Sequence, residues 1–84
     1  MITHETVEPI ESRDDLVAFI RTLRCSLTDV PSAWENADLP TYLDALAAWI
    51  EDMDGYFRNR GEVVPERPSW RLLAQMLSAA RLYE

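Results

Sequence analysis

The chain has 84 residues, a formal net charge of −7, eight arginines without a lysine, and a single cysteine. Its composition, 48% hydrophobic and 27% charged, predicts one globular domain with a small core and argues against a disordered chain. The longest apolar run, Ala45 to Ile50, is too short to span a bilayer. The acidic balance disfavours nucleic acid and anionic membranes as partners, because both are bound through cations. With one cysteine and no signal-peptide pattern, we expect a cytoplasmic protein, and the arginine-only usage indicates a bacterial source.

The first predicted helix runs from about residue 12 to 27. Residues 1–11 before it have no helical period and are interrupted by Pro9, so they are expected to form an irregular arm. Ser12 is a typical N-cap with acids in the turn after it, and Pro31 prevents the helix from continuing. The apolar residues of this helix recur at spacings of 4, 3 and 4: Leu16, Ile20, Leu23 and Leu27.

The second predicted helix, at about 39–60, carries the clearest pattern. Asp38 is a suitable N-cap, Gly61 a suitable stop, and the polar connection before the helix contains Trp34, which we expect over a helix junction. Six apolar residues step by 4, 3, 4, 3 and 4 and are predicted to face the core: Leu39, Leu43, Leu46, Ile50, Met53 and Phe57. A second stripe, rotated by about 60–100° from the first, consists of Tyr42, Trp49 and Tyr56.

A third helix is predicted from about 69 to 83, with Ser69 as its N-cap. It is apolar over most of its circumference, which predicts a central helix or one at an interface. Neither a repeat nor a second domain is apparent. The predicted fold class is therefore all-α: a single small domain of three main helices with an irregular N-terminal arm.

The acidic residues are concentrated in one part of the chain. Between Asp29 and Asp54 there are seven acids and no base, so this stretch alone carries a charge equal to that of the whole chain. The candidate partner-binding residues are the acids of the middle helix and the aromatic residues beside them: Tyr42, Trp49, Glu51, Asp52, Asp54 and Tyr56. Such a surface would steer a cationic protein and offer aromatic contacts. The alternative is a solvated face that maintains solubility, with the rings mostly in the core.

The same acids do not match a known metal or catalytic pattern. An EF-hand loop placed here would put Ile50 at its first ligand position. Glu51 and Asp54 lack the histidines that accompany carboxylates in a helical-bundle metal site. The single histidine, His4, has no nucleophile at a suitable spacing. We therefore predict no catalytic residue, metal or cofactor.

Three blocks of the sequence resemble a small uncharacterised bacterial family of unknown function. They are Trp-Glu-Asn at 34–36, Trp-x-x-Asp-Met-Asp-Gly-Tyr at 49–56 and Tyr-Glu at 83–84. The resemblance covers roughly residues 12–84 and implies no established activity. The Trp-Glu-Asn block and the acidic helix after it are also similar to small acidic immunity proteins of bacterial toxin systems, which bind their toxin directly.

Three function hypotheses follow from these patterns. The first is a non-enzymatic acidic protein-interaction module, in its sharper form an immunity-type inhibitor, that binds a basic partner. The second is a structural homo-oligomer with the third helix as its seam. The third, ranked last, is a small metal-binding protein or enzyme.

Overall fold

The structure, a computed structural model, describes residues 10–83. Over this range the chain forms three α-helices and one short 3₁₀ helix: α1 (Arg13–Asp29), η2 (Pro31–Ala33), α2 (Leu39–Asn59) and α3 (Trp70–Ala79). The described residues contain no strand, and the all-α prediction is confirmed. Of the predicted arm, only Ile10 and Glu11 belong to the described part of the chain.

Each helix begins after the residue that the sequence predicts as its cap. The N-caps are Ser12, Asp38 and Ser69. In each case the side-chain oxygen accepts a hydrogen bond from the backbone N–H three residues further on. Such a bond satisfies one of the N–H groups that lack a partner in the first helical turn, and it stabilises a helix by about 1 kcal/mol.

The end of α2 is also determined locally. Gly61 has a φ of 70°, a left-handed conformation that glycine adopts without the strain of a Cβ atom. The N–H groups of Gly61 and Glu62 donate to the carbonyl oxygens of Arg58 and Phe57, respectively. This pattern is a Schellman motif, which satisfies carbonyls of the last turn and confirms Gly61 as the stop signal.

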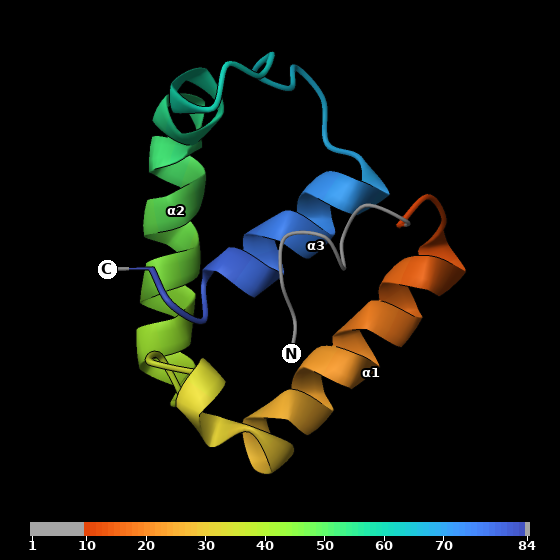
Figure 1. Cartoon of the computed structure of the whole chain (residues 1–84), viewed down its shortest axis with the longest axis vertical. Coiled ribbons are helices and arrows are strands. Elements are labelled where there is room, and N and C mark those ends of the chain that lie inside the picture. Colours follow the sequence, from red (N-terminus) through yellow and green to blue (C-terminus); the bar gives the residue numbers. More distant parts are fainter. Residues whose placement is uncertain (1–9, 84) are drawn as a thin grey trace.

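The helices are arranged with α3 between the other two. In Figure 1, α1 and α2 form the two arms of a V that converge at the η2 segment, and α3 lies in the space between the arms. Both α1 and α2 pack on α3. The third helix is therefore central, and its broad apolar surface is used within the chain.

Two clusters of buried residues hold this arrangement. The cluster between α1 and α3 consists of Ile10, Leu16, Phe19, Leu23 and Ala74, with Trp34, Leu73 and Leu77 packed against it. The cluster between α2 and α3 consists of Trp49, Phe57 and Leu72, with Met53, Tyr56, Val64, Met76, Ala79 and Tyr83 packed against it. Each outer helix thus has its own interface with α3, and Trp34 packs at the junction as expected.

The face that α2 turns to the core differs from the prediction. Of the six-residue stripe, only Phe57 is fully buried, whereas Leu39, Leu43 and Ile50 are 68%, 50% and 39% exposed. Trp49 of the second stripe is only 6% exposed. The predicted orientation holds at Met53 and Phe57, near the end of α2, and is wrong for Leu39, Leu43 and Ile50. There the aromatic stripe faces α3, since its large rings bury more apolar area per residue than aliphatic side chains do.

A smaller difference of the same kind occurs in α1. Ile20, expected on the buried line, is 42% exposed, and the neighbouring Phe19 is buried instead. Leu16 and Leu23 are buried as predicted. In both outer helices the core is therefore centred on an aromatic side chain.

The Trp34–Asn36 segment closes the structure by binding the C-terminal end of α3. Asn36 is buried, and its side-chain amide donates to the carbonyl oxygens of Ala80 (2.9 Å) and Tyr83 (2.8 Å). Two backbone N–H groups of the segment donate to the carbonyl of Arg81. We call these contacts between 34–36 and 80–83 the C-terminal clasp. The α3 helix ends at Ala79 and not at the predicted residue 83, and the clasp supplies donors for the carbonyls of the residues that follow it.

Arg81 strengthens the clasp from the other side. Its side chain is buried and donates to the carbonyl (2.9 Å) and the hydroxyl (3.2 Å) of Ser78 and to the carbonyl of Ala33 (3.2 Å). The indole N–H of Trp34 donates to the hydroxyl of Ser26 in α1 (2.9 Å). Within residues 10–83, every buried side-chain nitrogen or oxygen has a partner. The connection between α1 and α2 is thus bonded to both α1 and α3.

The different exposure of Trp49 and Leu43 predicts that alanine substitutions at these two positions change the stability by different amounts. Trp49→Ala should lower the free energy of unfolding by about 3–5 kcal/mol, because it leaves a cavity in the core. Leu43→Ala should lower it by less than about 1 kcal/mol, because half of that side chain is already in water. Urea denaturation followed by circular dichroism measures both. A larger loss for Leu43→Ala than for Trp49→Ala would show that α2 is turned the other way.

The clasp predicts that removal of the buried Asn36 side chain destabilises the protein. Asn36→Ala should lower the free energy of unfolding by about 1–3 kcal/mol, since two carbonyl oxygens at the end of α3 lose their donor. Asn59→Ala is a suitable control, because Asn59 is exposed at the end of α2. Equal stability of the two variants in urea denaturation would contradict the role of the clasp.

The cap of α2 predicts a pH dependence. The hydrogen bond from the Thr41 N–H lowers the pKa of Asp38 below its ordinary value of 3.8. A carboxyl with a lowered pKa in the folded state stabilises the protein above its unfolded-state pKa and loses this contribution as the pH falls through the folded-state value. The difference in unfolding free energy between the native chain and Asp38→Asn should therefore be constant above about pH 5. Below pH 3.8 the native chain should lose stability relative to Asp38→Asn. A pH-independent difference in urea denaturation would contradict this assignment.

Candidate functional site

The three aromatic residues of the predicted site lie on the inner side of α2. Trp49 is buried, and its ring centroid lies 5.4 Å from that of the half-buried Tyr56. The hydroxyl of Tyr42 donates to the carbonyl of Leu77 at 2.7 Å. Burial raises the pKa of Tyr42, and the positive charge of Arg81 acts in the opposite sense. These rings attach α2 to α3 and thereby determine which face of α2 is left to solvent.

The three carboxylates of the predicted site are all exposed, but they point in two directions. Asp52 accepts a hydrogen bond from the hydroxyl of Tyr83, and this bond raises the pKa of Tyr83. Glu51 and Asp54 lie further round the helix, away from the aromatic stripe. Neither has a cationic partner within the described range. The structure therefore leaves Glu51 and Asp54 available on the outer side and engages Asp52 on the inner edge.

Apolar residues that the helical period predicted in the core complete the outer side of α2. At 100° per residue, the side chains of Leu39, Leu43 and Ile50 lie within about 40° of one another around the helix axis. Those of Asp44, Glu51 and Asp54 lie to one side of them, about 60–140° around the axis from Leu39. We call the exposed set the α2 face; it consists of Leu39, Leu43, Ile50, Asp44, Glu51 and Asp54. The 4-3-4 spacing in the sequence identifies the apolar part of the α2 face, but it predicts these residues in the core.

A groove extends the apolar part of the α2 face toward α1. It has a volume of about 350 Å³ and is lined by residues of the C-terminal half of α1 and the first turn of α2. These two segments converge in Figure 1. Its lining is mostly apolar: Ile20, Leu23, Arg24, Leu27, Trp34, Asn36, Ala37, Asp38, Leu39, Tyr42 and Leu77. The two rims carry Ile20 of α1 and Leu39 of α2, both exposed.

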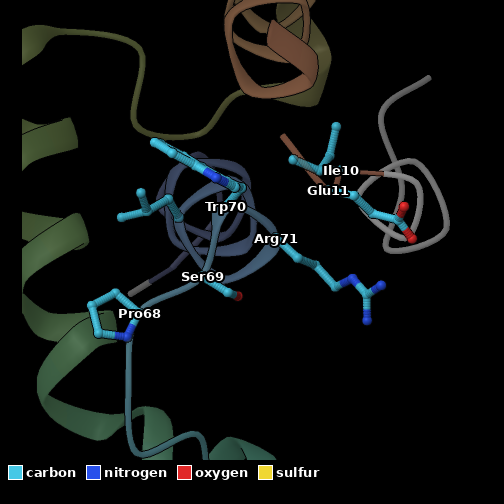
Figure 2. A pocket seen from close by; sticks show the side chains of 7 residues that line it. Ile10, Glu11, Pro68, Ser69, Trp70 and Arg71 are labelled. Atoms are coloured by element: carbon cyan, nitrogen blue, oxygen red, sulfur yellow. The ribbon is translucent and has the colours of Figure 1, made fainter. Parts of the chain in front are cut away.

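A second hollow, of about 660 Å³, lies at the start of α3. Figure 2 shows that Ile10 and Glu11 form one side of it and Pro68 to Arg71 the other, with the side chains of Trp70 and Arg71 directed apart. The oxygen of Ser69 already serves as the N-cap of α3. The lining also contains one carboxylate, Glu11, and one guanidinium, Arg71.

Residues 10–83 contain neither a cluster of metal ligands nor a membrane-spanning helix. In that range no three side chains of His, Cys, Asp or Glu are placed to hold a metal ion. No helix there is long and apolar enough to cross a bilayer. His4 lies outside the described residues, and Cys25 is exposed on α1.

Comparison with known proteins places the chain in one family. No match was found among the curated proteins or the solved structures. A family model described as "Family of unknown function (DUF7660)" matches residues 12–84, which include all three helices, the clasp and the α2 face. This range agrees with the extent of the resemblance seen in the sequence. The chain therefore belongs to DUF7660, a family of unknown function.

Proposed function

We propose that this protein is a non-enzymatic interaction module that binds a basic protein through the acidic side of α2, in the manner of an immunity-type inhibitor. One observation carries the proposal. All seven acids between Asp29 and Asp54 are exposed, and the stretch itself contains no arginine. A single-sign surface of this kind attracts an oppositely charged partner and orients it during encounter.

The structure modifies the site predicted from sequence in one respect. Tyr42, Trp49 and Tyr56 support α2 from its inner side, so the contact surface in our proposal consists of the α2 face. Glu51 and Asp54 supply its charge, and Asp52 contributes to the same negative field from the inner edge. The aromatic residues would act by holding the acids in a rigid helix.

The alternative of a homo-oligomer joined through the third helix has less support. Its motivation was the broad apolar surface of that helix, and α1 and α2 cover this surface within one chain. Trp70 and Leu82, at 41% and 47% exposure, are the large apolar side chains that this region still presents to solvent in the described range. The charge of the stretch from Asp29 to Asp54 therefore favours a basic partner.

The proposal predicts salt-dependent binding. A partner captured from the native host should bind at least about tenfold more weakly when the ionic strength rises from about 0.05 to about 0.5 M, because exposed charges are screened. The double variant Glu51→Gln/Asp54→Asn should weaken binding at low salt and reduce the salt dependence. The control Asp14→Asn/Glu66→Gln removes the same charge from α1 and from the connection before α3, and it should have a smaller effect. Binding that is insensitive to both salt and the α2 variant would contradict the proposal.

A further inference from the structure

We propose that the element bound by the α2 face is a cationic amphipathic helix that places a large apolar side chain in the groove between α1 and α2. This inference rests on the proposed function and adds the chemistry of the partner. It has three independent supports: the spacing of the exposed apolar residues, the groove beside them, and the position of the acids on one flank.

The exposed apolar residues of α2 have the spacing of a helix–helix contact. Leu39, Leu43 and Ile50 are exposed, and the half-buried Leu46 continues the same line. Residues at alternating spacings of 4 and 3 form the ridge that packs against a second helix. At 1.5 Å per residue the ridge from Leu39 to Ile50 is about 17 Å long, which corresponds to about three turns of a partner helix.

The groove provides a place for an anchoring side chain. It begins beside Leu39, at the N-terminal end of the ridge, and its rims and walls are formed by Ile20, Leu27 and Trp34. Its volume of about 350 Å³ and its apolar lining suit a bulky apolar side chain. Helices that bind in grooves use such anchors at the i, i+3, i+4 and i+7 positions. The ridge and the groove therefore form one continuous surface.

The acids indicate the charge of the partner. Asp44, Glu51 and Asp54 follow the ridge on one flank, and no cation of the described residues pairs with them. A partner helix with arginines or lysines along its matching flank would pair with these acids. A second copy of this chain would instead bring two chains of net charge −7 together, and the resulting repulsion opposes association. The charge pattern thus favours a cationic helix over a homodimer.

A synthetic peptide tests this inference directly, whatever the identity of the natural partner. The probe is a fluorescent peptide of about 18 residues with leucines at alternating spacings of 4 and 3 and arginines along one flank, long enough to cover the ridge. A scrambled peptide of the same composition has the same charge but no apolar side. Fluorescence anisotropy with the full chain should show at least about tenfold tighter binding of the amphipathic peptide. A version with glutamates in place of the arginines should not bind.

Two substitutions in the chain locate the contact. Leu39→Ala/Leu43→Ala should weaken binding of the amphipathic peptide at least about tenfold, with the helical circular dichroism retained because both side chains are already exposed. Val63→Ala is the matched control, since Val63 is 90% exposed in the connection between α2 and α3. It should leave the affinity unchanged.

The outcomes separate this inference from the proposed function. Equal binding of the scrambled and amphipathic peptides, or no effect of Leu39→Ala/Leu43→Ala, overturns the inference. The proposed function still stands in that case if the host partner responds to salt and to Glu51→Gln/Asp54→Asn. Sedimentation showing that the chain alone forms a dimer, and that Leu43→Ala dissolves it, would assign the face to a second copy and also overturn the inference.

Discussion

The arrangement of the three helices depends on the buried polar contacts of the C-terminal clasp. Asn36 and Arg81 are enclosed, and each donates to backbone carbonyls of a segment distant in sequence. In a low-dielectric interior such bonds are strong when complete and costly when broken, so they specify one geometry more sharply than apolar contacts do. The clasp attaches the connection between α1 and α2 to the end of α3 and so fixes where the two outer helices converge.

The orientation of α2 follows from this constraint and from its aromatic side chains. With its N-terminal end held near α3, α2 buries the side that carries Tyr42, Trp49 and Tyr56, together with Met53 and Phe57 from the end of the apolar stripe. The regular apolar stripe is then left partly in water. An 84-residue chain has little core to share among its helices, and a helix with one neighbour cannot bury two stripes. The exposed apolar ridge is thus a consequence of the same packing that stabilises the fold.

Local features of the fold were predictable because short-range forces determine them. The caps at Ser12, Asp38 and Ser69 and the stop at Gly61 involve residues within five positions of one another. The regular spacing from Leu39 to Phe57 likewise indicates one helix, and α2 spans all of these residues. The clasp was not predictable, because Asn36 and its acceptor Ala80 lie 44 residues apart in the sequence. The acids of the candidate site were identified as exposed, whereas its apolar ridge was assigned to the core.

The sequence by itself determined the three helices, their caps and the concentration of acids before and within α2. These depend on local hydrogen bonding, side-chain periodicity and charge count, all of which can be read along the chain. Only the tertiary structure decided which stripe of α2 is buried, how the Trp-Glu-Asn block is used and where an apolar groove opens. The physical reason is that two stripes, one mainly aliphatic and one aromatic, compete for one neighbouring helix. The choice between them depends on the shape of α3 and on the clasp, both formed by residues far away in sequence.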